Sequence, residues 1–426
     1  MLAIRHCPDG GVTMTHAAER VVITGMGVAS PIGLSVNEFW QGLLEGRSGI
    51  SQLEEKIYRE LKTYIGGAIN EFDGVDYFGR KVARRISRSS QLALLAAEEA
   101  LDQACLLTSE LARDHVGVIV GSSIGGYAAA DPFFRDFYVS RKFSPLVVPL
   151  SMNVGPSSNL SIHYGFRGPC YSVDGACASA GHSMGSAYNL IRFGQEKMIV
   201  TGGADSAFSP AVVASWSSMR ALSVRNDEPE RALRPFSADR DGTVLGEGAA
   251  IFVLESERSA IERGAIILAE IIGYGATSDA YHITKPSLMG PSSAMQKALD
   301  DAGLQAEDID YINAHATGTR ANDNNEVAAI KQVFGEHAYK IPVVGNKGAF
   351  GHSIAASGAL ELAGCIMAIK DQIVPMTLNY SEPDPACDLD FVADGKRRQN
   401  VERVMNNSFA FGGSNASLIV QAYQAH

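Results

Sequence analysis

Side chains that can act as a nucleophile or as proton acceptors stand where strand-like runs of this chain give way to loops or helices. Cys177 follows the strand-like run that ends at Val173, passes through small residues and precedes a helical pattern. At a helix N-terminus, unpaired backbone N–H groups and the helix dipole favour thiolate over thiol. The position therefore predicts a nucleophile that attacks at neutral pH. The alternative is a small buried cysteine in a tight turn, since free cysteines are among the most buried residues.

Two histidines and a lysine occupy comparable loop ends in the second half of the chain. His315 follows the strand-like run 309–313, and His352 follows a glycine-spaced loop that also holds Lys347. Polar side chains at strand ends often form functional sites. A lone histidine is more often structural, but two histidines with a lysine and a helix-capping cysteine favour one reactive centre. No carboxylate loop completes a Cys-His-Asp triad, so amide hydrolysis is the weaker interpretation.

The elements that must position these residues alternate along the chain. Strand-like runs begin at 21, 116, 198 and 309, and helical patterns cover 91–104, 178–193 and 293–302. This alternation predicts a mostly parallel sheet covered by helices. The run 271–275 echoes 23–27, and Gly351-His352-Ser353 echoes Gly181-His182-Ser183. The repeats predict two related α/β halves that face each other, with Cys177 and His352 near their pseudo-twofold axis.

Composition narrows the class of protein. The chain has 426 residues, 46% hydrophobic and 19% charged, which suits one large domain or two packed ones. A formal charge of -11 argues against nucleic-acid binding, which needs a basic face. No run approaches the roughly eighteen apolar residues of a membrane span. Six scattered cysteines without a CxxC pair predict free thiols, no metal site and a cytoplasmic location. Residues 1–19 predict a flexible tail.

A basic cluster stands out against the acidic whole. Arg80, Lys81, Arg84, Arg85 and Arg88 lie within nine residues, and the last four have helical spacing. A basic helical patch on an acidic protein can steer an acidic partner. A solvated helix face explains the cluster equally well.

Several separated motifs resemble the elongating β-ketoacyl-acyl-carrier-protein synthases, the ketosynthases of the thiolase superfamily. The resemblance runs from Arg20 to about Val420. Its motifs include Val22-Ile23-Thr24-Gly25-Met26-Gly27, Ala176-Cys177-Ala178-Ser179, Arg234-Pro235-Phe236, Asn313-Ala314-His315, Lys347 with Gly351-His352, and Phe411-Gly412-Gly413-Ser414-Asn415. The resemblance implies a thiolase-like αβαβα sandwich of two duplicated βαβαβ halves. Residues 20–262 would carry the cysteine, and residues 263–426 would carry the histidine pair.

The activity that the resemblance implies is a decarboxylative Claisen condensation. Cys177 would carry the acyl group, because a thioester keeps its acyl group reactive and leaves well. His315 and His352 would hold the malonyl thioester oxygen and stabilise the enolate, and Lys347 would orient them. Backbone N–H groups of Cys177 and Phe411 would form the oxyanion hole, with Phe411 as a gate. Substrates would arrive on the phosphopantetheine of an acyl carrier protein, with no metal or redox cofactor.

Further positions follow from the same resemblance. The residues that would contact substrate are Thr317, Thr319, Ile124 and Phe409. Three acids would support the catalytic residues, namely Asp323, Glu326 and Glu361. The carrier protein would dock on Lys81, Arg84 and Arg85, with Arg225 as a weaker addition.

Some questions stay open at this stage. The pathway is either fatty-acid elongation or a specialised polyketide, polyene or nodulation-type lipid route. The chain works as a homodimer or with a second ketosynthase-like subunit. A chain-length-factor-like partner would lack the nucleophile, and a thiolase would need a second cysteine that 407–411 does not contain. Ala410 replaces the usual glycine beside the gate, so we expect the gate loop to move differently.

Overall fold

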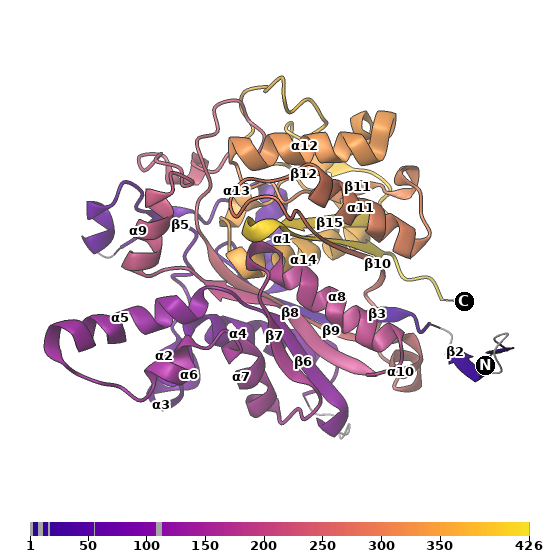
Figure 1. Cartoon of the computed structure of the whole chain (residues 1–426), viewed down its shortest axis with the longest axis horizontal. Coiled ribbons are helices and arrows are strands. Elements are labelled where there is room, and N and C mark those ends of the chain that lie inside the picture. Colours follow the sequence, from indigo (N-terminus) through magenta and orange to yellow (C-terminus); the bar gives the residue numbers. More distant parts are fainter. Residues whose placement is uncertain (1–2, 7–11, 16–17, 55, 108–112, 426) are drawn as a thin grey trace.

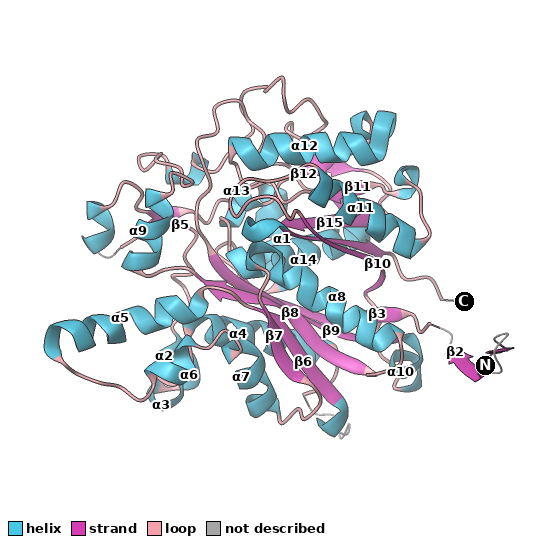
Figure 2. Ribbon diagram, in the orientation of Figure 1, coloured by secondary structure: helices cyan, strands magenta, loops and turns pink. Residues whose placement is uncertain are grey.

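Ten strands form one continuous sheet in the described part of the chain, with the neighbour order β12-β11-β15-β16-β10-β3-β9-β8-β6-β7 (Figures 1 and 2). The computed structural model describes residues 3–6, 12–15, 18–54, 56–107 and 113–425. The strands of the sheet are β3 (Val21–Ala29), β6 (Val116–Gly121), β7 (Cys170–Val173), β8 (Met198–Ser206), β9 (Glu247–Ser256), β10 (Ala269–Ser278), β11 (Tyr311–Asn313), β12 (Val343–Val344), β15 (Arg403–Phe409) and β16 (Ser414–Gln421).

The α-helices are α1 (Val36–Glu45), α2 (Gly74–Phe78), α3 (Arg80–Ala83), α4 (Arg88–Gln103), α5 (Gly125–Ser140), α6 (Val147–Ser151), α7 (Gly155–Tyr164), α8 (Ser179–Arg192), α9 (Pro210–Ser218), α10 (Glu257–Glu262), α11 (Met289–Ala302), α12 (Arg320–Phe334), α13 (Lys347–Phe350) and α14 (Ser357–Asp371). Three short 3₁₀ turns border the site described below, namely η3 (Ala176–Ala178), η7 (Ile354–Ala356) and η8 (Phe411–Gly413).

The sheet consists of two groups of five strands with one topology. The first group reads β3-β9-β8-β6-β7 and the second β10-β16-β15-β11-β12. In chain order, both are 1-5-4-2-3, and in both the first strand is antiparallel to the fifth and the fifth to the fourth. The fourth, second and third strands are parallel in each group. The predicted duplication is confirmed.

The predicted mostly parallel sheet is wrong in one respect. Five of the nine pairings in this sheet are antiparallel, including the β3–β10 pairing that joins the two groups. Helices cover both faces, so antiparallel strands read as the same continuous apolar runs that parallel strands give. Sequence patterns alone therefore could not set strand direction.

The helices complete an αβαβα sandwich. Helices α8 and α14 contact each other and strands of both groups, so they form the middle layer. Helices α4 and α7 cover the outer face of the first group, and α11 and α12 cover that of the second (Figure 1). The thiolase-like α/β class is confirmed.

Paired glycines let the outer helices sit close to the first strand of each group. A Cβ at Gly25 or Gly27 would come within 2.0 Å of a carbonyl oxygen of α4, and one at Gly275 within 2.0 Å of a carbonyl oxygen of α11. Only glycine permits this approach. The echo of 23–27 in 271–275 is therefore structural.

The echo between Gly181-His182-Ser183 and Gly351-His352-Ser353 is wrong as a structural match. His182 lies inside α8, whereas His352 precedes η7. The true equivalence lies at the 3₁₀ turns that precede α8 and α14, because each turn begins at a residue with a left-handed backbone.

The predicted flexible tail of residues 1–19 lies largely outside the described residues. Strands β1 (Ala3–His6) and β2 (Val12–Thr15) pair with each other there. The boundaries between halves at 20–262 and 263–426 stay a prediction.

Candidate active site

Cys177 lies in η3, immediately before the middle-layer helix α8. Ala176 before it has φ +49°, a left-handed conformation that costs a non-glycine residue energy. The Ser179 hydroxyl offsets this cost, because it donates to the Ala176 carbonyl at 2.6 Å and accepts from the Gly175 N–H at 2.9 Å. The turn holds the thiol at the boundary between the two halves.

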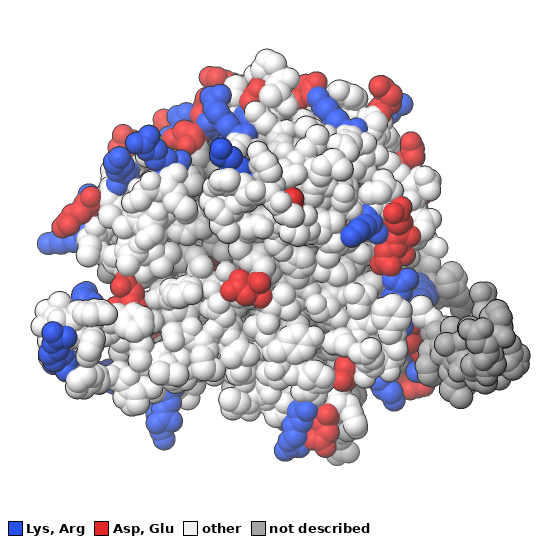
Figure 3. All heavy atoms as spheres, in the orientation of Figure 1, with Lys and Arg blue, Asp and Glu red and all other residues white. Residues whose placement is uncertain are grey.

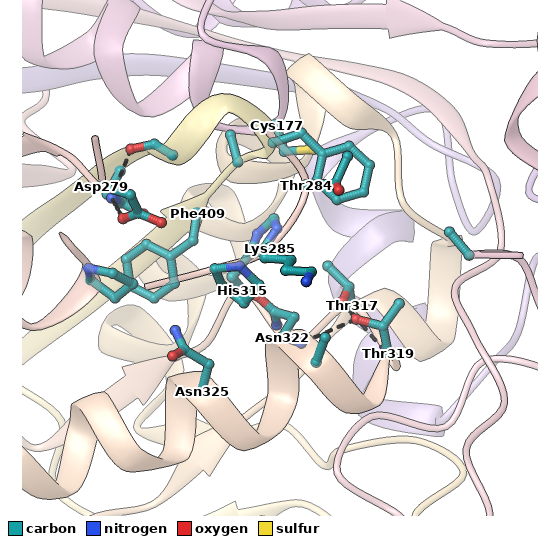
Figure 4. Close-up of a pocket in the computed structure, with 18 of the residues that line it drawn as sticks. Cys177, Asp279, Thr284, Lys285, His315, Thr317, Thr319, Asn322, Asn325 and Phe409 are labelled. Atoms are coloured by element: carbon teal, nitrogen blue, oxygen red, sulfur yellow. Dashed lines mark hydrogen bonds between the residues drawn. The ribbon is translucent and has the colours of Figure 1, made fainter. Parts of the chain in front are cut away.

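Two imidazoles from the second half face the thiol. His352 Nε2 lies 3.0 Å from Cys177 Sγ, and the ring centroids of His315 and His352 are 5.3 Å apart. One ligand-type atom from each of Cys177, His315 and His352 lies within 4.8 Å of the others. Figure 4 shows His315 and Cys177 on the wall of one pocket. Cys177 and His352, which are 175 positions apart in the sequence, are thus in direct contact across the two halves.

A buried ion pair supports His315 from behind. Lys347 Nζ donates to the His315 carbonyl at 2.5 Å and lies 3.3 Å from His315 Nδ1. The same ammonium pairs with Glu361 Oε1 at 2.5 Å, and both side chains are fully buried. A charge removed from water is tolerated when it is paired in this way. Lys347 therefore has a fixed position.

A second buried carboxylate shapes the loop that carries His315. Glu326 of α12 accepts from the backbone N–H of His315 at 2.7 Å and of Ala316 at 2.8 Å. Asp323, one turn earlier, accepts from Gly318 at 3.2 Å. Ala316 needs such support because its φ is +43°.

Both catalytic-type imidazoles are held neutral. Burial lowers the pKa of His315 well below its usual range, and the charge of Lys347 and the neighbouring His352 lower it further. Burial and Lys347 likewise lower the pKa of His352. Neutral imidazole offers one N–H donor and one acceptor, so each ring can hold an oxygen atom or take up a proton.

The expectation of a thiolate at Cys177 is wrong for this closed site. Burial raises the pKa of the thiol to about 12, against the smaller opposing effects of Lys347 and the backbone N–H groups of Phe411 and Cys177. Desolvation outweighs the helix terminus because Cys177 is only 5% exposed. Cys177 is therefore a thiol at rest, with its sulfur in contact with His352 Nε2.

The cysteine and two histidines also make a donor set of the kind that binds metal ions. Lys347 disfavours a metal here, because its ammonium lies on the far side of His315 at 3.3 Å and would repel a dication. The predicted absence of a metal stays a prediction.

Comparisons with known proteins agree with this geometry. Residues 18–260 match the beta-ketoacyl synthase N-terminal domain, and residues 268–381 match the beta-ketoacyl synthase C-terminal domain. Together these matches cover more than half of the chain. The chain belongs to the β-ketoacyl synthase family.

Curated relatives cover nearly the whole enzyme. The 3-oxoacyl-[acyl-carrier-protein] synthase 2 of Synechocystis sp. is 41% identical over 95% of this chain and 99% of that protein. Nodulation protein E of Rhizobium meliloti is 42% identical over 94% of this chain and 98% of that protein. A β-ketoacyl synthase from Burkholderia phymatum superposes with a TM-score of 0.88 at 37% identity, covering 95% of this chain and 100% of that one.

The enzyme is a carbon–carbon bond-forming acyltransferase. It condenses an acyl group with malonyl-acyl carrier protein, with loss of carbon dioxide, to give a β-ketoacyl product. Its fold is that of ketosynthases from type II polyketide systems as well. One such structure, an acyl carrier protein in complex with its ketosynthase, superposes with a TM-score of 0.87 at 31% identity over 96% of this chain and 100% of that one.

Most of the residues that the sequence predicts to contact substrate line the pocket above Cys177. Phe409, Phe411, Thr317 and Thr319 line it, and the two threonine hydroxyls lie 2.9 Å apart. Phe411 is 39% exposed at the mouth. Ile124 does not line this pocket but packs in the apolar cluster that contains Cys177.

The predicted basic helix is wrong as a single helix, although its charges are exposed. Lys81 lies in α3, Arg84 and Arg85 follow in a turn, and Arg88 begins α4. Lys81, Arg84 and Arg85 are solvent-exposed and form no ion pair among the described residues. Arg88 instead pairs with Glu247 at 2.9 Å and holds the backbone of 69–72. Arg80 is also exposed and without an ion pair among the described residues, so four of the five cations of the cluster are free for a partner.

Arg225 is less available than the sequence suggests. Its guanidinium lies 3.4 Å from Asp239 and 3.7 Å from Asp241 and is 33% exposed. Asp239 and Asp241 offset the positive charge of Arg225 that an acidic carrier protein would need, so Arg225 is a weak candidate for docking.

Several residues of the site escaped sequence analysis. Trp216 of α9 stacks on Phe411 with ring centroids 5.6 Å apart. Asp205 accepts from the backbone of Ile124 at 3.2 Å and of Ala355 at 3.3 Å, and so ties the two halves beside Cys177. Asp279 accepts from Asn415 at 2.8 Å. Each comes from a segment without a local motif, so only the folded chain brings it to the site.

Within the described ranges, none of the helices is long and apolar enough to cross a membrane.

Proposed function

We propose that Cys177 carries the growing acyl chain and that His315 and His352 drive decarboxylation of the malonyl unit. The contact between His352 Nε2 and Cys177 Sγ at 3.0 Å carries this proposal, because it gives the buried thiol a proton acceptor. Carbon–carbon bond formation by a β-ketoacyl synthase needs both an acyl carrier and enolate stabilisation.

In the first half-reaction, Cys177 Sγ attacks the carbonyl carbon of an acyl thioester on the carrier arm. His352 Nε2 accepts the thiol proton as the S–C bond forms, which avoids a free thiolate in an apolar site. The carrier's thiol leaves and takes up the proton. Ser357 Oγ, 2.9 Å from His352 Nδ1, can donate or accept, so it suits either tautomer of the ring.

In the second half-reaction, the bond between the malonyl α-carbon and its carboxyl group breaks and releases carbon dioxide. The electron pair left behind forms an enolate, whose oxygen accepts N–H bonds from His315 and His352. The α-carbon then attacks the acyl-Cys177 carbonyl, the S–C bond breaks, and Sγ leaves as a thiolate that takes up a proton from solvent to restore the thiol. Donors that are already in place when charge develops give a large share of such rate enhancement.

The backbone N–H groups of Cys177 and Phe411 both reach the sulfur, where each lowers the pKa of the thiol. We assign them to the tetrahedral oxygen that forms at the acylated carbon. Phe411 at the pocket mouth serves as the gate, and Lys347, Glu361, Glu326 and Asp323 hold the histidine loops in place.

The acyl carrier protein is the proposed partner, and Lys81, Arg84 and Arg85 are its proposed docking residues. They are unpaired cations on a protein of net charge -11, which suits contact with an acidic domain. Thr317 and Thr319 line the entry and are assigned to the phosphopantetheine arm. The cytoplasmic location stays a prediction.

We propose a dimer built on the face that carries β7. This strand ends the sheet and pairs only with β6 among the described strands, with Cys170 and Tyr171 exposed. Figure 3 shows mostly uncharged surface over β7 and α8. Tyr138 of α5 is 72% exposed and the nearby Phe143 82%. A bare sheet edge beside large exposed apolar side chains is a common interface.

A heterodimer is the second candidate. A structure described as the ishigamide ketosynthase/chain length factor superposes with a TM-score of 0.88 at 34% identity, over 96% of this chain and 100% of that one. Because Cys177, His315 and His352 are all present, this chain would be the catalytic subunit of such a pair. Fatty-acid elongation and a specialised polyketide or nodulation-type lipid route both remain consistent with its relatives.

A single experiment tests the function. The purified protein is incubated with a panel of acyl carrier protein thioesters, and intact mass identifies the acyl group that stays on Cys177. Malonyl-acyl carrier protein is then added, and the β-ketoacyl product is measured. Acylation without condensation by the pure chain, restored by a second ketosynthase-like subunit, would favour the heterodimer. No acylation with any donor would contradict the proposal.

A further inference from the structure

The pocket that leads to Cys177 contains one full positive charge on its lining that the mechanism does not use. Lys285 is the only lysine or arginine among the described residues that line this pocket. Lys347 lies behind His315 and is paired with Glu361. The two histidines are neutral. An anionic substrate that enters therefore meets its counter-charge at Lys285.

The surrounding loop presents Lys285 to the pocket and leaves its ammonium free. His282 Nδ1 accepts from the backbone N–H of Thr284 at 3.0 Å and of Lys285 at 3.2 Å, which fixes the turn. The neighbouring acid, Asp279, is occupied by Asn415 and by the Ser287 N–H at 2.9 Å. The Lys285 side chain forms no hydrogen bond or ion pair within the described chain, and Figure 4 shows it extended into the opening that Thr317 and Thr319 line.

We propose that Lys285 binds the phosphate of the carrier arm as it enters the pocket. This inference rests on the proposed function, because it assumes a substrate on phosphopantetheine. Two anions could meet Lys285, namely that phosphodiester and the malonyl carboxylate. The carboxylate becomes neutral carbon dioxide in the transition state, so an ion pair with it would stabilise the ground state and slow the reaction. The phosphate keeps its charge throughout, so its ion pair gains binding without this cost.

The flexible four-carbon stem of Lys285 suits this role. A lysine is a compact charge that can follow an entering phosphate, and the exposed position lets it swing between solvent and pocket. Exposed ion pairs are weak, so the expected contribution is about 1.5- to 5-fold in affinity, and salt should reduce it.

The test compares donors that differ only in the phosphate. Hexanoyl-phosphopantetheine and hexanoyl-pantetheine acylate Cys177 of the wild type, and kcat/KM is measured for each by intact mass. Lys285→Met should lower kcat/KM for the phosphorylated donor about 1.5- to 5-fold and leave the other donor unchanged. Lys285→Arg should keep most of the preference. Lys340→Met, which removes an exposed lysine outside the pocket lining, is the matched control.

The other outcomes separate the explanations. Equal kcat/KM for both donors in the wild type and Lys285→Met would overturn the phosphate site. If Lys285→Met instead slows only condensation with malonyl-phosphopantetheine and malonyl-pantetheine alike, the lysine binds the carboxylate, and the proposal is also overturned. If neither donor acylates the wild type, the proposed function fails, whereas a loss confined to the phosphate preference concerns Lys285 alone.

Discussion

The two halves of the enzyme share a topology but differ in what they bury around the reaction centre. In both, a left-handed residue and a 3₁₀ turn precede the middle-layer helix, with Ala176 before α8 and Ile354 before α14. The next residue is Cys177 in the first half and Ala355 in the second. The proposed nucleophile therefore occupies a position that occurs in both halves but holds a cysteine in only one of them.

The surroundings of Cys177 and of the histidine loops differ in polarity. Cys177 packs in an apolar cluster with Val213, Leu245 and Ile354. The second half instead buries Lys347 with Glu361 beside its histidine loops. The comparison teaches that one copy of the fold surrounds its turn with apolar side chains, which suits the proposed acyl carrier. The other half presents a buried ion pair whose lysine also contacts the loop of His315.

Removal of the Cys177 thiol should have the largest effect, because this thiol is the main chemical difference between the two turns. Cys177→Ala should make the two turns chemically alike and reduce acylation to below about one-thousandth of the wild-type rate, since no other group replaces a covalent nucleophile. Intact mass after incubation with an acyl-carrier thioester measures it. Cys365→Ala, at another buried thiol, is the control and should keep acylation. An acyl group still attached to the Cys177→Ala enzyme would place the nucleophile elsewhere.

A substitution of His315 tests the second half, which carries the buried ion pair. His315→Ala should lower malonyl decarboxylation about 10²- to 10³-fold, because it removes one donor to the enolate oxygen. Transfer of an acyl group to Cys177 should change far less, since His352 and not His315 contacts the sulfur. Carbon dioxide release and acyl-enzyme formation are measured separately. An equal loss in both half-reactions would mean that His315 only maintains the structure.

The protonation state of the Cys177 thiol gives a further test of how the two halves differ. Because burial raises the pKa of Cys177 to about 12, the thiolate fraction should rise tenfold per pH unit. Alkylation of Cys177 by iodoacetamide should therefore rise about 100-fold from pH 7 to 9 without a plateau. Peptide mass analysis distinguishes this site from exposed Cys105 and Cys170. A plateau near pH 8 would show that the helix terminus outweighs burial.

The outer surface of the first half is tested by charge reversal. Lys81→Glu, Arg84→Glu and Arg85→Glu together should raise the KM for acyl carrier protein about tenfold, because these unpaired cations would then repel an acidic partner. Transfer from hexanoyl-pantetheine should stay unchanged, and Lys340→Glu serves as a charge control. An equal loss with both donors would mean that the patch is structural.

The gate loop, where the halves meet, gives the smallest expected effect. Ala410 has φ -126° and ψ 156°, which any residue adopts, so its methyl group fits the closed loop without strain. Ala410→Gly should mainly add flexibility, worth about 0.4 to 1 kcal/mol, and so speed acylation about two- to fivefold. Stopped-flow acylation measures the change. Unchanged kinetics would remove any role for this side chain in gating.

Much of this enzyme follows from its sequence alone. The alternation of strands and helices, the glycine pairs at 25 and 27 and at 273 and 275, and the ordered motifs around Cys177, His315 and His352 identify the fold class, the duplication and the family. These features are local, because each depends on side-chain types at fixed spacing.

Only the tertiary structure decided strand direction, the protonation of Cys177 and the neighbours that the motifs lack. Trp216 of α9 and Lys285 of a loop lie at the pocket because separate segments converge there, and no spacing in the sequence records that distance. The pKa of Cys177 depends on how completely the two halves exclude water, which outweighs the local helix terminus. Burial and proximity between distant segments are properties of the packed chain, so the sequence pattern could not determine them.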